Sequence, residues 1–293
     1  MMKRALVIAP RSMLGMQLCK ALRARGVHVL TAGRSPEDDV PFDLQATSAP
    51  AVQPTQTADI VFHCAASFTG DTEAGISLNF QSNTTSAWQV AAMSGMLGAS
   101  RLVYAGTISS SYASTDWANY NSYGLSKGLG EQILKWALDK SGIGFSSLRF
   151  SQLYDVDGLC CRHQPWFGRI VAYAARGLNL RLPESLGSRN FLHVEDAAEF
   201  MIRAAERDVS GVLEILHPEF LTCDQLAEIA YAIFARGGQV IRAPEKQPFR
   251  KICFPEVGTV FEKLGQPSVD MRTGLSMIKD RNTWAVFGPM DVI

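Results

Sequence analysis

The stretch ALVIAPRSMLGMQLCKALRARG, residues 5–26, contains the pattern that decides the fold. Its first five residues are apolar and predict a buried strand over 5–9. Apolar residues then recur with helical spacing from Leu14 to Leu22, and Gly26 follows at a position typical of a helix C-terminus. A strand that turns directly into an amphipathic helix is the building unit of a parallel α/β sheet.

The same alternation continues through the first half of the chain. Apolar runs predict further strands over 27–31, 60–63, 101–105 and 144–149. Helical patterns cover 77–96 and 123–140. Strands separated by helices predict βαβ units, so we expect an α/β fold with a Rossmann-type, doubly wound parallel sheet.

The second half of the chain is less regular. Pro165, Pro183 and Pro218 interrupt it, and helices are predicted over 166–176, 195–207 and 223–235. We expect residues 1–153 to form a dinucleotide-binding Rossmann domain, to which 189–216 returns. Residues 154–188 and 217–293 are expected to form a smaller, irregular C-terminal cap that binds the substrate.

Composition excludes several classes of protein. The 293 residues include 28 basic and 28 acidic side chains, so no basic excess indicates a nucleic-acid partner. The six cysteines are scattered without a Cys-x-x-Cys pair, and we expect no metal site and no disulfide framework. The apolar stretch at the N-terminus is too short for a signal peptide or a membrane span, which favours a cytoplasmic protein with no membrane partner.

The turn after the first strand, Ala9-Pro10-Arg11-Ser12-Met13-Leu14-Gly15, lies where a dinucleotide's pyrophosphate would bind helix-terminal N–H groups. A three-glycine spacing is reduced here to Gly15, with Ala9 and Ser12 at the other two positions. Small residues still allow close backbone approach, although neither tolerates positive φ as glycine does. The loop therefore predicts either a cofactor-binding turn, with Ala9, Arg11, Ser12, Met13, Leu14 and Gly15 in contact, or an ordinary strand–helix turn.

Arg34 follows the second predicted strand. A carboxylate at this site would bind an adenosine ribose 2′-OH, whereas an arginine suits a 2′-phosphate. Arg34 and Arg11 therefore favour NADP over NAD as the cofactor; the alternative for Arg34 is a solvated surface side chain.

Tyr123 and Lys127 are four residues apart on the predicted helix 123–140, so they share one face. A nearby ammonium favours the phenolate, and we expect Lys127 to lower the pKa of Tyr123. Such a phenol can exchange a proton with an alcohol or a carbonyl. The alternative is a phenol on the helix surface with no chemical role.

Several further segments occur in an order similar to the motifs of one family. They are Asp43-Leu44, Val61-Phe62-His63-Cys64-Ala65-Ala66, Asn79, Tyr104-Ala105-Gly106-Thr107, Tyr123 with Lys127, Arg149-Phe150-Ser151-Gln152-Leu153-Tyr154, and Arg189-Asn190-Phe191-Leu192-His193-Val194-Glu195-Asp196. Together with the altered glycine turn, they resemble the extended short-chain dehydrogenase/reductase family, the NAD-dependent epimerase/dehydratase group that acts largely on nucleotide sugars.

The resemblance implies roles for individual residues. Tyr123 would be the acid/base, Lys127 would bind the nicotinamide ribose, and Thr107 would position the substrate oxygen. Further cofactor contacts are implied at Asp43, Leu44, Cys64, Ala65 and Ala66, beside Lys127. Substrate contacts are implied at Ser67, Thr107, Tyr123, Ser151 and Arg189. The resemblance also implies a homodimer formed through the helices 77–96 and 123–140.

The chain departs from the family pattern at three places. The first turn has lost glycines, and Asp155 replaces the glycine that normally follows Tyr154. Thr107 lies only sixteen residues before Tyr123, so Ser109, Ser110 or Ser111 could supply the hydroxyl instead.

Three functions remain open from the sequence. The first is an NAD(P)-dependent oxidoreductase or epimerase that acts on a hydroxyl or carbonyl of a nucleotide-linked sugar. The second is an NADP-dependent reductase of another small carbonyl substrate. The third is a non-catalytic sensor or scaffold that binds dinucleotide weakly, which the altered glycine turn favours and the Tyr123–Lys127 pair opposes.

Overall fold

The computed structural model describes residues 2–46, 48, 50–256 and 258–290, and the chain divides into two compact units. The larger unit comprises Met1–Phe150, Ala197–Ile215 and Cys253–Gln266. The smaller unit comprises Ser151–Asp196, Leu216–Ile252 and Pro267–Ile293. The segment Cys253–Gln266, which the sequence pattern places in the cap, thus belongs to the larger unit. Residues 151–153 and 189–196, which the pattern places in the Rossmann domain, belong to the smaller unit.

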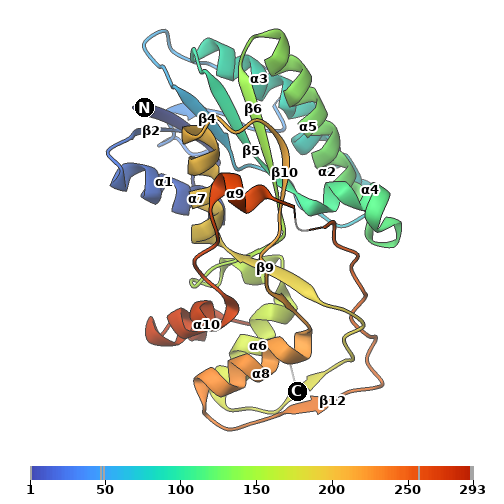
Figure 1. Cartoon of the computed structure of the whole chain (residues 1–293). Coiled ribbons are helices and arrows are strands. Elements are labelled where there is room, and N and C mark those ends of the chain that lie inside the picture. Colours follow the sequence, from blue (N-terminus) through green and yellow to red (C-terminus); the bar gives the residue numbers. More distant parts are fainter. Residues whose placement is uncertain (1, 47, 49, 257, 291–293) are drawn as a thin grey trace. The chain divides into compact units, whose positions relative to one another are not determined.

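A seven-stranded parallel sheet forms the centre of the larger unit, in the order β10-β6-β5-β4-β1-β2-β3 (Figure 1). The strands are β1 (Arg4–Ile8), β2 (His28–Gly33), β3 (Val40–Pro41), β4 (Ile60–His63), β5 (Arg101–Thr107), β6 (Gly144–Phe150) and β10 (Gly211–Ile215). The strand order reverses at β1, since β2 lies on one side of it and β4 on the other. Such a reversal is where open α/β sheets bind ligands. The predicted Rossmann-type sheet is confirmed.

Helices cover both faces of this sheet (Figure 1). They are α1 (Met13–Ala24), α2 (Glu73–Asn79), the π-helical turn η1 (Phe80–Thr85), α3 (Ser86–Met96), α4 (Tyr112–Thr115), α5 (Ser122–Lys140), α7 (Val194–Glu206) and α9 (Val260–Leu264), with short 3-10 turns η2 (Ile108–Ser111) and η3 (Trp117–Asn119). Leu14, Leu18 and Leu22 are the buried stripe of α1, as their spacing predicts.

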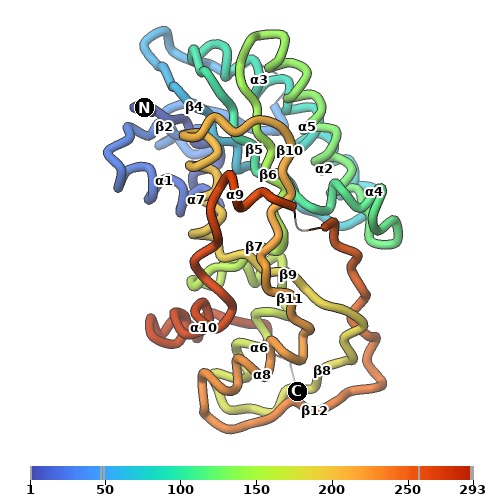
Figure 2. Tube along the Cα trace, in the orientation of Figure 1, coloured from blue at the N-terminus to red at the C-terminus, as the bar shows by residue number. Residues whose placement is uncertain are grey.

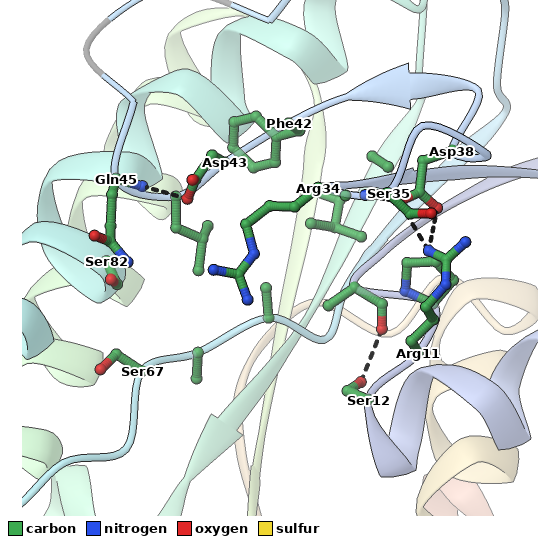
Figure 3. A pocket seen from close by; sticks show the side chains of 18 of the residues that line it. Arg11, Ser12, Arg34, Ser35, Asp38, Phe42, Asp43, Gln45, Ser67 and Ser82 are labelled. Atoms are coloured by element: carbon green, nitrogen blue, oxygen red, sulfur yellow. Dashed lines mark hydrogen bonds and ion pairs between the residues drawn. The ribbon is translucent and has the colours of Figure 1, made fainter.

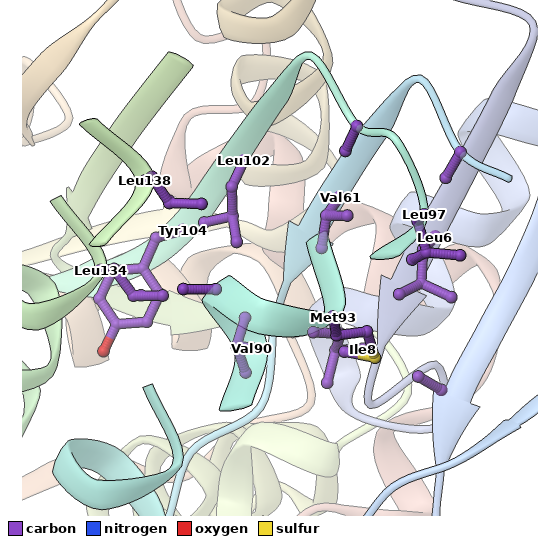
Figure 4. Packing of buried hydrophobic residues seen from close by; sticks show 14 of the residues in the cluster. Leu6, Ile8, Val61, Val90, Met93, Leu97, Leu102, Tyr104, Leu134 and Leu138 are labelled. Atoms are coloured by element: carbon purple, nitrogen blue, oxygen red, sulfur yellow. The ribbon is translucent and has the colours of Figure 1, made fainter. Parts of the chain in front are cut away.

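The core between the sheet and the helices α3 and α5 explains why these segments fold together. Leu6 and Val61 from the strands meet Val90 and Met93 of α3, and Leu134 of α5 packs near Tyr104 (Figure 4). Each of these side chains is at most 1% exposed. Burial of such apolar side chains stabilises the fold by roughly 2 kcal/mol each.

Two elements differ from the sequence-based expectation. The sequence pattern predicts one helix over 77–96, but the helix begins at Glu73 and a π-helical turn interrupts it at Phe80–Thr85. Strand β1 ends at Ile8, and Ala9 has a left-handed φ of 60°. The turn thus starts one residue earlier than the apolar run indicates.

The smaller unit combines short strands with helices (Figure 2). Strands β11 (Phe220–Leu221), β9 (Arg189–His193) and β7 (Gln152–Tyr154) form a three-stranded sheet, and β12 (Val240–Arg242) pairs with β8 (Leu180–Leu182). Its helices are α6 (Pro165–Arg176), α8 (Cys223–Phe234) and α10 (Met271–Asp280), with 3-10 turns η4 (Leu159–Arg162) and η5 (Trp284–Val286). Among the described residues, no helix is long and apolar enough to cross a membrane.

Candidate active site

A cavity of about 550 Å³ lies beside the C-terminal ends of β1, β2 and β4 in the larger unit (Figure 3). The residues that line it are Ile8, Ala9, Pro10, Arg11, Ser12, Ala32, Gly33, Arg34, Ser35, Asp38, Phe42, Asp43, Leu44, Gln45, Ala65, Ala66, Ser67, Leu78 and Ser82. This is the point of strand reversal, where a dinucleotide would be bound.

The turn between β1 and α1 keeps a phosphate-binding shape without its usual glycines. Ala9 adopts φ of 60°, a conformation that normally favours glycine. Ser12 caps α1: its Oγ donates to the Ala9 carbonyl at 2.8 Å and accepts from the Gly15 N–H at 3.0 Å. A Cβ at Gly15 would lie 2.1 Å from the Ala9 oxygen, so glycine is required there. The tight turn therefore forms with Ala9 in a strained, left-handed backbone conformation.

Most of the predicted cofactor contacts border this cavity. Ala9, Arg11, Ser12, Arg34, Asp43, Leu44, Ala65 and Ala66 do so, together with Ser67, which was predicted to contact the substrate. Met13, Leu14, Gly15, Cys64 and Lys127 are not among the described residues that line it. Leu14 is buried in the core and Gly15 packs on Ala9, so these two support the loop from behind.

Two arginines border one end of the cavity and differ in their partners. Arg11 Nη1 donates to Asp38 Oδ1 at 2.8 Å and to Asp38 Oδ2 at 2.9 Å. Arg11 Nη2 lies 3.2 Å from Glu37 Oε2. Arg34 extends into the cavity (Figure 3), and makes no hydrogen bond or ion pair with any described residue. No sequence pattern indicates that Asp38 binds Arg11.

Two asparagines tie the loop after β4 to helix α5. Asn79 is fully buried; its Oδ1 accepts from Ser67 Oγ at 3.0 Å, and its Nδ2 donates to Ser122 Oγ at 2.9 Å. Asn83 accepts from the Ser67 N–H at 2.8 Å and donates to Ser126 Oγ at 3.0 Å. Asn79 thus has a structural role, and Asn83, which sequence reasoning missed, acts in the same way. Through these hydrogen bonds, the two side chains fix the position of Ser67, which lines the cavity, relative to α5, the helix that carries Tyr123.

The structure brings Tyr123 and Thr107 together. Tyr123 lies in the first turn of α5, which the side chain of Asn121 caps, and it is half-buried. Its ring meets that of Phe68 edge-on, with centroids 4.5 Å apart. Burial raises the pKa of Tyr123 to about 12, and a hydrogen bond with the Thr107 side chain acts in the opposite direction. The expectation that Lys127 lowers this pKa is therefore wrong for this structure, because desolvation of the phenol dominates.

Lys127 is buried beside the end of β5. Its Nζ donates to the Ala105 carbonyl at 2.8 Å and lies 3.9 Å from the centre of the Tyr104 ring. Burial lowers the pKa of Lys127 to about 7, although the Glu131 carboxylate opposes this effect. One N–H of the ammonium is used by Ala105, and the two others have no hydrogen-bond acceptor among the described residues.

Two of the three serines that follow Thr107 have their hydroxyls engaged elsewhere. Ser110 Oγ donates to the Gly124 carbonyl at 3.0 Å, and Ser111 Oγ donates to Glu214. Ser109 presents its backbone N–H to Thr107 Oγ at 3.2 Å. Of the four hydroxyl candidates, Thr107 is the one whose side chain hydrogen-bonds that of Tyr123.

A buried ion pair lies one helical turn beyond Lys127. Glu131 accepts from Arg149 at 2.6 Å and from Ser147 Oγ at 2.5 Å. Arg149 also donates to Ser111 Oγ at 3.0 Å. Sequence reasoning missed Glu131, although its spacing of four from Lys127 places it on the same helix face and could have indicated it.

Ser151 and Arg189, both predicted to contact the substrate, lie in the smaller unit. Ser151 is buried, and its Oγ has no hydrogen-bond partner among the described residues. Arg189 is also buried and donates to the carbonyls of Ser188 and Arg250 at 3.1 and 2.6 Å. Asp155, at the position of a family glycine, accepts from the N–H groups of Leu159 and Cys160 at 3.1 and 2.9 Å and thereby stabilises the turn at η4.

Solved structures share this fold across nearly the whole chain. UDP-N-acetylglucosamine 4-epimerase from Bacillus cereus is 21% identical, with 94% of this chain and 97% of that chain covered and a TM-score of 0.73. UDP-glucose 4-epimerase from Thermotoga maritima, solved with UDP-glucose, is 18% identical, with coverages of 96% and 99% and a TM-score of 0.72. WbmF from Bordetella bronchiseptica, solved with NADH, is 18% identical, with coverages of 97% and 94% and a TM-score of 0.73. No match was found among curated proteins.

A family model shows which family the chain belongs to, whereas the solved structures, at these identities, show the fold alone. The model of the NAD dependent epimerase/dehydratase family matches residues 5–215, which include most of β1, the altered glycine turn, Thr107, Tyr123 and Lys127. The match confirms the resemblance inferred from the order of the motifs. The chain belongs to the NAD dependent epimerase/dehydratase family of enzymes.

Proposed function

We propose that the protein is an NAD(P)-dependent enzyme that oxidises, reduces or epimerises a hydroxyl or carbonyl of a nucleotide-linked sugar. The observation that carries this proposal is the grouping of Thr107, Tyr123 and Lys127 at the end of β5 and the start of α5. A hydroxyl, a phenol and a buried ammonium together can position a substrate oxygen and transfer a proton to or from it during hydride transfer.

Each of the three side chains has a separate task in this proposal. A bound nicotinamide cofactor supplies hydride transfer. Tyr123 gives a proton to the substrate carbonyl oxygen, or takes one from the hydroxyl in the reverse direction. Thr107 hydrogen-bonds the same substrate oxygen and positions it against Tyr123. Lys127 binds the nicotinamide ribose with the N–H groups that Ala105 does not use.

NADP is proposed as the preferred cofactor. Arg34 extends into the cavity as a cation without a described partner, and an arginine suits a 2′-phosphate. The solved relatives named above include one with NADH, so the preference is a property proposed for this chain alone.

A nucleotide sugar is proposed as the substrate because several structural relatives are UDP-sugar epimerases. Ser151 and Arg189 of the smaller unit are proposed to contact it. The buried Ser151 Oγ, which has no described partner, supports this role. A loosely binding, non-catalytic scaffold is the second candidate, and the strained Ala9 in the phosphate-binding turn is the observation that favours it.

A homodimer formed through α3 and α5 is proposed as well. Trp88 on α3 and Trp136 on α5 are 58% and 59% exposed, and their ring centroids lie 6.3 Å apart. Two neighbouring exposed tryptophans form an apolar surface that a second copy of the chain would cover. We also propose a cytoplasmic location, which the six free cysteines support.

Titration of the protein's tryptophan fluorescence with NADPH and with NADH tests the cofactor proposal. Saturable binding of at least one dinucleotide is expected, followed by interconversion of UDP-glucose and UDP-galactose, or reduction of a UDP-keto sugar, detected by NMR. Absence of saturable binding with either dinucleotide would overturn the enzyme proposal in favour of a scaffold.

A further inference from the structure

Asp38 occupies a position that its place in the sequence does not suggest. It follows β2 by five residues, yet its carboxylate lies directly against Gly33, the last residue of that strand. A Cβ at Gly33 would be only 2.6 Å from Asp38 Oδ2. The missing side chain of Gly33 therefore makes room for a carboxylate at the strand end, where dinucleotide-binding folds commonly carry the acid that binds the ribose 2′-OH.

This carboxylate is held firmly and faces the cavity. Its side chain is 1% exposed and accepts from the Ser35 N–H at 3.0 Å as well as from Arg11. Asp38, Arg11 and Arg34 all line the same cavity (Figure 3).

The two arginines therefore differ in the charge they can offer a phosphate. The charge of Arg11 is balanced by Asp38, and Glu37 lies 3.2 Å from its second nitrogen. Arg34 has no such partner among the described residues. A 2′-phosphate entering this end of the cavity would meet one free cation and one cation already bound to a buried anion.

We infer that Asp38 is a specificity-determining residue, which limits the preference for NADP over NAD by neutralising Arg11. The charge of Arg34 produces the preference for NADP. Asp38 limits the size of this preference, so that both dinucleotides bind. The inference rests on the proposed binding of a nicotinamide dinucleotide in this cavity.

Two variants remove the effect of Asp38 by different means. Asp38→Asn keeps the shape and the hydrogen-bonding oxygen but removes the charge. Gly33→Ala adds a methyl group that displaces the carboxylate, which can move because it is the end of a side chain. Both release Arg11 towards a phosphate. The matched control is Asp39→Asn, which makes the same charge change at the next residue; Asp39 is not among the described residues that line this cavity.

The experiment measures the dissociation constants of NADPH and NADH for each folded variant, with thermal melting as the check of folding. We expect Asp38→Asn and Gly33→Ala to raise the NADPH-to-NADH affinity ratio about fivefold, because the half-exposed Arg11, once released from Asp38, would add one charge contact to the 2′-phosphate. Asp39→Asn should leave the ratio within about twofold of wild type, because a solvent-exposed charge outside the cavity is largely screened. Arg34→Met should lower the ratio below that of wild type.

An unchanged ratio in both Asp38→Asn and Gly33→Ala overturns the inference, as does an equal loss of both affinities, which would make Asp38 only a structural support of the loop. A wild-type protein that binds neither dinucleotide is a different result, since it overturns the proposed function itself.

Discussion

Lys127 Nζ donates a hydrogen bond to the carbonyl oxygen of Ala105 at 2.8 Å. This bond joins the first turns of α5 to the end of β5 and holds the ammonium in a buried site. Burial lowers its pKa to about 7, well below the ordinary lysine value of 10.5. The protonation of Lys127 therefore changes within the range where the protein can be assayed.

Dinucleotide binding should weaken as the pH rises above 7. If the ribose hydroxyls require the ammonium, the free protein must take up a proton to bind above that pKa, and affinity should fall by up to about tenfold per pH unit. Lys127→Met should bind weakly at every pH. Lys135→Met, an exposed lysine on the same helix, should keep the wild-type profile. Fluorescence titration between pH 6 and about 9 measures this, and a flat wild-type profile would contradict the assignment.

Tyr123→Phe should lower turnover by about 10²–10⁴-fold, because a general acid/base contributes that range. Thr107→Val should lower it less, since the phenol remains. Tyr231→Phe serves as the control: its hydroxyl donates to the Leu178 carbonyl in the smaller unit and has no proposed role in the chemistry. Turnover of Tyr123→Phe close to wild type would mean that the phenol is a structural group only.

Ala9→Gly should raise the free energy of unfolding by about 1 kcal/mol, because glycine adopts the left-handed conformation of this residue without the Cβ penalty. Ala32→Gly, in the neighbouring strand β2, should lower it by about the same amount, since no strain is relieved there. Urea denaturation monitored by circular dichroism measures both. A loss of stability in Ala9→Gly would show that the turn is not strained.

Asn79→Ala should lower the free energy of unfolding by roughly 3 kcal/mol, because buried partners on the 67–69 loop and on α5 lose their hydrogen bonds. Gln81→Ala is the control, since Gln81 is exposed and makes one bond to the Gln45 carbonyl. Catalytic turnover of the folded Asn79→Ala protein should also fall, because Ser67 and α5 are no longer held together. An effect no larger than that of Gln81→Ala would contradict this role.

Replacing Trp88 and Trp136 together by Glu should convert the proposed dimer into a monomer, since two charges would be buried at the interface without partners. Trp117→Glu provides the comparison, because Trp117 is 75% exposed but lies outside α3 and α5. Light scattering coupled to size-exclusion chromatography measures the mass. A monomeric wild-type protein would rule out the dimer.

Much of the fold could be predicted from local sequence. Apolar runs such as 60–63 coincide with strands because a strand buried on both faces needs little more than continuous hydrophobicity. The spacing of Tyr123 and Lys127 placed both on one helix, since helix geometry alone sets which residues share a face. The π-helical turn at Phe80–Thr85 has no local signal in the sequence, and Asn79 and Asn83, just before and within it, bind side chains of α5 more than 40 residues away.

What the sequence by itself determined is the order of strands and helices, the family, and the residue types available for proton transfer. These follow from periodicity and spacing, which are properties of neighbouring residues. The tertiary structure alone decided that Asp38 fills the space beside Gly33 and binds Arg11, and that burial raises rather than lowers the pKa of Tyr123. The position of Asp38 depends on contacts with Gly33 and Arg11, and the pKa of Tyr123 depends on desolvation of its phenol. No local sequence pattern encodes either of them.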